Sequence, residues 1–127
     1  MTATSTRSAM RILYLEDEPI IALDTADMLS DLGFGDIAMV HSLPAAERVL
    51  SAGKPDVALL DVNMGHGRTS IALGTLLIEA GIPVVFATGY APSALPCDPR
   101  ALVIEKPFRV ETLDRALRNV TEHRPVN

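Results

Sequence analysis

Short apolar runs alternate with segments of helical periodicity along this 127-residue sequence, and that alternation restricts the fold more than any other feature. Each run is short enough to be a buried strand. We predict strands at 11–16, 36–40, 57–60, 83–87 and 101–104. Strands that alternate with helices indicate an α/β fold, in which helices cover both faces of a doubly wound parallel sheet. Chain order alone leaves the order of the strands within the sheet open.

About five helices are expected between and after these strands. Pro19 at a first helical position opens a helix that Gly33 ends, and Ser42 caps a second helix that stops near Gly53. A third helix, at 69–80, is apolar nearly all round. Apolar stripes predict which faces pack on the sheet: Ile21, Met28, Leu29 and Leu32 in the first helix, and Val110, Leu113, Leu117 and Val120 in the last.

Polar residues stand at the carboxyl ends of four predicted strands. The first strand ends in Glu16 and Asp17, the third in Asp61, the fourth in Thr88 and the fifth in Lys106. Doubly wound sheets bind ligands outside the carboxyl ends of their strands, where the strand order reverses. If the order is 2-1-3-4-5, the first and third strands are neighbours, and their carboxylates meet while the threonine and the lysine approach from the other side.

The acidic run Glu16-Asp17-Glu18 needs positive charge from elsewhere, because adjacent carboxylates repel each other and lose hydration when they are buried. We expect Lys106 and a metal ion to supply it, and the oxygen ligands suit Mg²⁺. Asp61 ends an apolar strand before a glycine-rich loop, so it is the candidate nucleophile that would carry an aspartyl phosphate. Lys106, Mg²⁺ and the Thr88 hydroxyl would stabilise the phosphoryl oxygens.

From about Met10 to His123, these residues together resemble the receiver domains of bacterial two-component response regulators. The resemblance implies a flavodoxin-like sheet in the order 2-1-3-4-5, with Asp61 as the phosphoacceptor and Mg²⁺ as the cofactor. By the same resemblance, Glu16 and Asp17 match the acidic pair of receivers, Thr88 matches their switch hydroxyl and Lys106 matches their phosphate-pairing lysine. Asp17 would bind Mg²⁺ directly, Glu16 through water and Asn63 through its backbone carbonyl, while Thr88 and Lys106 would contact the phosphoryl group.

The stretch Phe86-Ala87-Thr88-Gly89-Tyr90 is similar to the FATGUY subgroup of receivers, many of them single-domain proteins in general stress signalling with sensor histidine kinases. Receivers usually carry an aromatic switch residue three positions before the lysine, where this sequence has Val103. Either Tyr90 takes that role or the switch differs. We expect Tyr90, Val103 and Phe108 on a phosphorylation-sensitive partner surface, and a cis Lys106-Pro107 bond.

The function implied is a phosphoryl acceptor that is served by a histidine kinase or a histidine phosphotransfer protein. It would catalyse only its own phosphorylation and dephosphorylation, and signal through a downstream protein or a phosphorelay. A phosphorylation-independent docking module is the alternative. A haloacid-dehalogenase-type phosphohydrolase needs an aspartate where Asn63 stands, and a flavodoxin-like cofactor module needs a Ser-, Thr- and Gly-rich loop where the acidic run 16–18 stands.

Composition bounds the remaining expectations. We predict flexible tails at 1–9 and 124–127 around one domain at 10–123, with no output domain. The 16 acidic and 11 basic residues give a net charge of −5, which disfavours nucleic acid and anionic lipid as partners. Helix-breaking prolines such as Pro83 and Pro92 exclude a membrane-spanning helix within the uncharged stretch 80–97. The single Cys97 fits a reducing, cytoplasmic location, and we expect a monomer or weak dimer.

Overall fold

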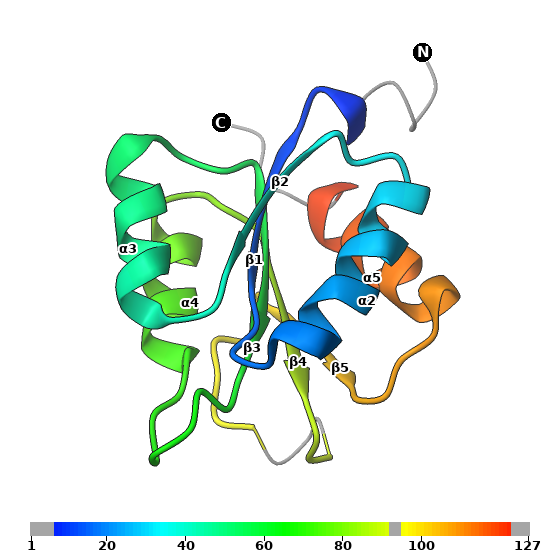
Figure 1. Ribbon diagram of the computed structural model, residues 1–127. Coiled ribbons are helices and arrows are strands. Elements are labelled where there is room, and N and C mark those ends of the chain that lie inside the picture. The colour runs from blue at the N-terminus through cyan, green and yellow to red at the C-terminus, as the bar shows by residue number, and fades with distance from the viewer. Residues whose placement is uncertain (1–6, 92–94, 123–127) are drawn as a thin grey trace.

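Five parallel strands form one sheet in the order β2-β1-β3-β4-β5, as the resemblance to receivers implied. The computed structural model describes residues 7–91 and 95–122 (Figure 1). Its strands are β1 (Arg11–Leu15), β2 (Asp36–Val40), β3 (Val57–Asp61), β4 (Val84–Thr88) and β5 (Leu102–Glu105). All five predicted strands are therefore confirmed, and β1 lies beside β3 at the point where the strand order reverses.

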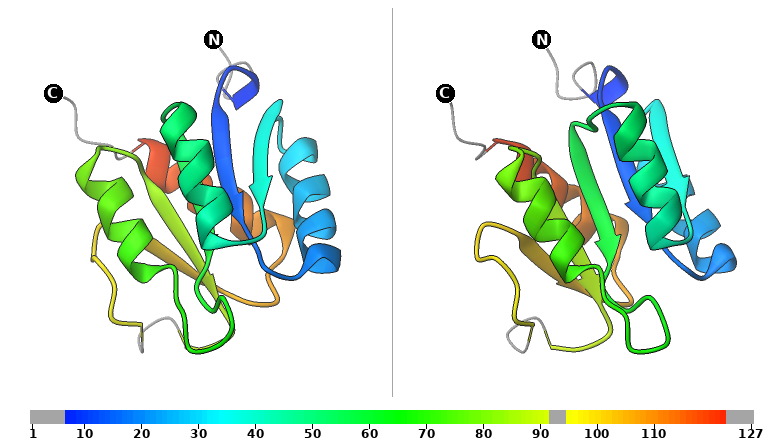
Figure 2. Two further views of the ribbon diagram at one scale, coloured as in Figure 1. Left: turned by 60° about the vertical axis from the view of Figure 1, so that its left-hand side comes forward. Right: turned by 90° about the vertical axis from the view of Figure 1, so that its left-hand side faces the viewer.

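Helices cover both faces of this sheet (Figures 1 and 2). On one face lie α2 (Pro19–Asp31) and α5 (Val110–Glu122), and on the other lie α3 (Leu43–Ala52) and α4 (Ile71–Glu79). The sequence predicted about five helices. The residues that the structure describes form these four, besides two helical residues, 7 and 8, before β1. The described part of the connection from β4 to β5 has no helix.

Alternate residues of each strand pack into different layers of the core. Ile12 and Tyr14 of β1 face the layer under α2 and α5, whereas Leu13 and Leu15 face the layer under α3 and α4. Every residue of the central strands β3 and β4 is buried. The two layers hold the strand ends at a fixed spacing, and this spacing positions the polar residues that follow them.

The face that α2 presents to the sheet matches the predicted stripe except at its start, because Leu29 is buried while Met28 and Leu32 pack against the same cluster. Its buried residues are Ala22, Thr25 and Leu29, while Ile21 remains 39% exposed. A helix that lies close to a sheet accommodates small side chains at the contact, so the stripe chosen by side-chain size was wrong by about one position at its start. Met28 is partly buried against the same cluster, as expected.

The boundaries of α3 and the stripe of α5 agree with the sequence. Ser42 is the N-cap of α3, and its Oγ accepts a hydrogen bond from the Ala45 backbone N–H at 3.2 Å. Gly53 is the C-cap. In α5 the predicted residues Leu113, Leu117 and Val120 are buried, together with Ala116, whereas the predicted Val110 at the start of the helix is only partly buried.

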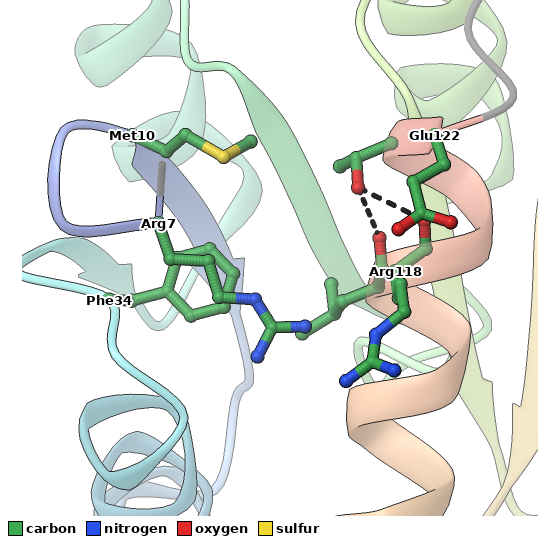
Figure 3. Close-up of a pocket in the computed structure, with 7 residues that line it drawn as sticks. Arg7, Met10, Phe34, Arg118 and Glu122 are labelled. Atoms are coloured by element: carbon green, nitrogen blue, oxygen red, sulfur yellow. Dashed lines mark hydrogen bonds between the residues drawn. The ribbon is translucent and has the colours of Figure 1, made fainter. Parts of the chain in front are cut away.

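Arg7 lies against the domain, although the sequence placed residues 1–9 in a flexible tail. Its guanidinium donates to the Leu32 carbonyl at 3.0 Å, pairs with Asp114 Oδ1 at 2.6 Å and lies 5.3 Å from the centre of the Phe34 ring. These contacts join the end of α2 to α5, so Arg7 packs against the domain. Figure 3 shows Arg7 beside a cavity of about 160 Å³ that Met10, Phe34, Arg118 and Glu122 also line.

The remaining predicted tail residues, 1–6 and 124–127, lie outside the described residues. Across residues 7–91 and 95–122, none of the helices has both the length and the apolar character that a membrane span requires.

Candidate functional site

The predicted strand-end residues meet at one edge of the sheet. Glu16 and Asp17 directly follow β1, Asp61 ends β3, Thr88 ends β4 and Lys106 directly follows β5. In a parallel sheet all of these positions are carboxyl ends. The neighbouring strands β1 and β3 pair in register from Ile12 with Val57 to Leu15 with Leu60, which brings the acidic residues at their carboxyl ends together.

Lys106 joins two of the carboxylates directly. Its Nζ donates to Glu16 Oε1 at 2.9 Å and to Asp61 Oδ1 at 3.0 Å. Burial acts to lower the pKa of Lys106, but the hydrogen bonds to Glu16 and Asp61 outweigh burial, so the pKa is raised overall. Its backbone N–H donates to the Thr88 carbonyl at 2.7 Å, which fixes the start of the segment after β5. The Lys106-Pro107 peptide bond is cis, as predicted.

Three carboxylates form a cluster that Lys106 neutralises only in part. One oxygen each from Glu16, Asp17 and Asp61 lies within 4.8 Å of the others, and Glu16 and Asp61 are buried. If all three are ionised, three negative charges and one lysine leave a charge of −2. Burial raises the pKa of Asp61 to about 7, Lys106 opposes the rise and Glu16 adds to it. Oxygen ligands with excess negative charge fit a small divalent cation such as Mg²⁺.

The two acidic residues of the pair have different surroundings. Glu16 accepts hydrogen bonds at both carboxylate oxygens, from Lys106 Nζ and from the Glu18 backbone N–H at 3.2 Å. Asp17 is only partly buried and faces the loop after β3, where a Cβ added to Gly65 would lie 3.8 Å from its Oδ2. The oxygens of Glu16 are therefore already engaged, whereas Asp17 lies beside the loop that carries Asn63.

The loop from β3 to α4 is a narrow hairpin. Asn63 and Thr69 form an isolated antiparallel bridge, and the Met64 backbone N–H donates to the Arg68 carbonyl at 3.0 Å. The tip, residues 65–67, has positive φ angles of 80°, 53° and 73°, which its two glycines adopt readily. His66 at the tip is exposed, and the backbone carbonyl of Asn63 remains a predicted metal ligand.

The three residues predicted for a switch surface lie in different surroundings. Tyr90 is 66% exposed, and its backbone N–H donates to the buried Thr88 Oγ1 at 3.1 Å. Val103 is partly buried against the core layer under α3 and α4, while Phe108 is partly buried against the layer under α2 and α5. Of the three, Tyr90 is thus the one linked directly to Thr88.

Two further polar residues contact the site through its backbone. The Ser70 hydroxyl is buried and donates to the Asp61 carbonyl at 2.7 Å. The His41 ring donates Nδ1–H to the Glu16 carbonyl at 2.9 Å. Sequence reasoning missed both, since Ser70 stands where a helix start is expected and His41 directly follows an edge strand.

Solved structures with this fold include receiver proteins of response regulators. None of the protein-family models searched matches the chain. A response regulator receiver protein from Sinorhizobium medicae WSM419 is 27% identical, with a TM-score of 0.81 over 92% of this chain and 98% of that chain. Its match extends over nearly the whole of both chains, so the shared fold is the receiver fold.

The PhyR regulators are similar as well. The Phyllosphere-induced regulator PhyR of Methylorubrum extorquens is 32% identical over 105 residues, which is 80% of this chain and 39% of that protein. A solved structure of the PhyR stress response regulator is 26% identical and has a TM-score of 0.80, covering 98% of this chain and 49% of that one. This chain therefore spans less than half the length of the PhyR proteins. Together with the fold and the site, these similarities show that the chain belongs to the receiver-domain family of response regulators.

Proposed function

We propose that this receiver accepts a phosphoryl group on Asp61 in a Mg²⁺-dependent reaction, with a histidine kinase or a histidine phosphotransfer protein as the donor. The observation that carries the proposal is the position of Lys106 Nζ, which lies within 3.0 Å of both Glu16 and Asp61 in a cluster of three carboxylates. Such a cluster has the charge, the nucleophile and the paired cation that phosphoryl transfer requires.

The residues of the site have complementary roles in this reaction. A carboxylate oxygen of Asp61 attacks phosphorus, the P–N bond to the donor histidine breaks, and its electron pair returns to the imidazole nitrogen. Lys106 pairs with the phosphoryl oxygens, and the Thr88 hydroxyl donates to one of them. A bound Mg²⁺, held by Asp17, Asp61, the Asn63 carbonyl and Glu16 through water, would neutralise further charge on the transferred group.

The output of the phosphorylated protein is contact with a downstream protein or onward transfer of the phosphoryl group. Hydrolysis of the aspartyl phosphate on the same domain ends the signal, so the chemistry is confined to its own phosphorylation and dephosphorylation. This chain is similar to two PhyR proteins, and one of them is described as a stress response regulator. The similarity supports a role in general stress signalling.

Incubation with Mg²⁺ and acetyl phosphate tests this function. We expect the wild-type mass to increase by one phosphoryl group, in a form that hydroxylamine removes, and peptide mapping to place the group at Asp61. Asp61→Asn should abolish labelling, whereas Asp27→Asn, on the exposed side of α2, should label normally. Equal labelling of Asp61→Asn and wild type would refute the assignment.

Binding of a downstream partner separates the phosphorylation switch from the docking alternative. A switch requires that the phosphorylated protein bind the partner with different affinity, because a signal needs differential contacts in the two states. A partner that binds wild type and Asp61→Asn equally, with and without phosphodonor, would instead support phosphorylation-independent docking.

A further inference from the structure

Ser70 is completely buried, and its polar groups bond to both sides of the β3–α4 loop. The side-chain hydroxyl donates to the Asp61 carbonyl at 2.7 Å, and the backbone N–H donates to the Val62 carbonyl at 3.0 Å. Its own carbonyl accepts from the Gly74 N–H at 2.9 Å, the first hydrogen bond of α4. Ser70 therefore connects the backbone of the candidate phosphoacceptor to the start of a helix.

The hydroxyl of Ser70 makes this bond in place of capping the helix. Ser70 occupies the N-cap position of α4, yet its side chain makes no cap hydrogen bond. At the equivalent position of α3, the Ser42 hydroxyl accepts from the Ala45 N–H in the usual way. A serine that holds a strand-end carbonyl in preference to its own helix breaks a local rule at the site, which is where such departures are expected.

The helix that carries Ser70 is closely packed against the sheet. Gly74, one turn further along α4, lies directly against the Phe86 ring of β4, and a Cβ added there would come within 2.2 Å of Phe86 Cζ. The first turn of α4 is thus packed against the strand that ends in Thr88. This contact leaves α4 little room to move toward the sheet, and it places the Ser70 hydroxyl at hydrogen-bond distance from the Asp61 carbonyl, the kind of packed support that a precise site requires.

We infer that Ser70 is a positioning residue for phosphoryl transfer, which acts by holding the Asp61 carbonyl and thereby the peptide plane between Asp61 and Val62. That plane sets the direction of the Asp61 side chain and the course of the loop toward Asn63. The inference rests on the proposed function of Asp61. Without the hydroxyl, the carbonyl loses this donor, and the carboxylate is no longer held in one orientation toward Lys106.

Ser70→Ala tests the inference, with Ser42→Ala as the matched control. We expect Ser70→Ala to weaken Mg²⁺ binding and to slow phosphorylation by acetyl phosphate, each by about tenfold or more. Loss of a residue that orients a metal ligand typically has an effect of this size. The ¹³C resonance of the Asp61 carbonyl should also shift. Ser42→Ala should lower the stability of the protein while leaving the Mg²⁺ affinity, the phosphorylation rate and the Asp61 carbonyl resonance unchanged. Ser70→Thr, which retains the hydroxyl, should recover most of the rate.

The outcomes separate this inference from the function on which it rests. If wild type takes up no phosphoryl group, the proposed function fails, and the Asp61 carbonyl shift alone decides whether Ser70 holds that backbone. If wild type is labelled and folded Ser70→Ala matches it in Mg²⁺ affinity and rate, the inference is wrong. Should Ser70→Ala not fold, Ser70→Cys, with a weaker donor of similar size, should give an intermediate rate, and a wild-type rate would overturn the inference.

Discussion

Asp61 is a carboxylate held in a position that favours its protonated form. Burial raises its pKa from 3.8 to about 7, and the hydrogen bond from Lys106 does not cancel the rise because burial is the larger effect and the neighbouring Glu16 adds to it. A folded-state pKa above the unfolded value means that the folded protein binds the proton more tightly. This tighter proton binding therefore adds its full amount to the free energy of unfolding below about pH 4, and the added stability is lost as the pH rises through 7.

We therefore predict that Asp61→Asn stabilises the Mg²⁺-free protein at pH 8. Amide replacement removes the charge that the site disfavours, and a pKa rise of this size corresponds to a few kcal/mol, at roughly 1.4 kcal/mol per unit. The gain should shrink as the pH falls toward 5, where folded Asp61 is protonated. Urea unfolding in EDTA at both pH values measures it.

The exposed substitution Asp27→Asn should show no such pH dependence and serves as the control. A lower stability of Asp61→Asn than of wild type at pH 8 would mean that the pair with Lys106 stabilises the fold more than burial of the charge destabilises it.

At the scale of elements, the contact between α4 and β4 depends on Gly74, which has no side chain to separate the helix from the Phe86 ring. Ala normally stabilises a helix relative to Gly by about 1 kcal/mol. At Gly74 the added Cβ would lie 2.2 Å from Phe86 Cζ and 2.9 Å from Phe86 Cε1, in a fully buried contact, so the helix or the ring must shift. We predict that Gly74→Ala destabilises the domain by about 1–3 kcal/mol, the usual cost of overpacking, as measured by chemical unfolding.

Gly53→Ala is the matched control, because a Cβ there meets no atom within 4 Å and the φ angle of 162° is extended backbone that any residue adopts. Its stability should stay close to that of wild type. In the Gly74→Ala background, Phe86→Leu should restore part of the loss by making room. A Gly74→Ala protein as stable as wild type would show that α4 does not rest on the ring.

At the scale of the whole molecule, sequence patterns predicted the sheet but not the tertiary support of the site. Five strands and the residues at their ends could be predicted, since a buried parallel strand is a continuous apolar run and polar residues after it are conspicuous. The anchoring of Arg7 could not, because its partners Leu32, Phe34 and Asp114 are distant in sequence. The role of the Ser70 hydroxyl was hidden for a similar reason, as a serine before a helix indicates only a cap.

The link between Thr88 and Tyr90 predicts where the molecule responds to phosphorylation. Thr88 Oγ1 accepts a hydrogen bond from the Tyr90 backbone N–H at 3.1 Å. A phosphoryl group on Asp61 would draw that oxygen toward itself. The Tyr90 amide would lose its partner at the start of a connection whose described residues form no helix, and such segments rearrange at low cost. The change should continue into β5, because Thr88 pairs with Glu105 and its carbonyl accepts the Lys106 N–H.

Hydrogen exchange with and without beryllofluoride, a mimic of the phosphoryl group, measures this response. We expect altered protection within 88–108, with the largest change at the Tyr90 amide, and little change in α3, which packs on the opposite side of the sheet from α2 and α5. Thr88→Ala removes the responding hydroxyl, so it should abolish the change at Tyr90 even when beryllofluoride binds. If changes were confined to 19–53, the signal would leave the site through α2 and α3, and the hydroxyl of Thr88 would not be the contact that distinguishes the two states.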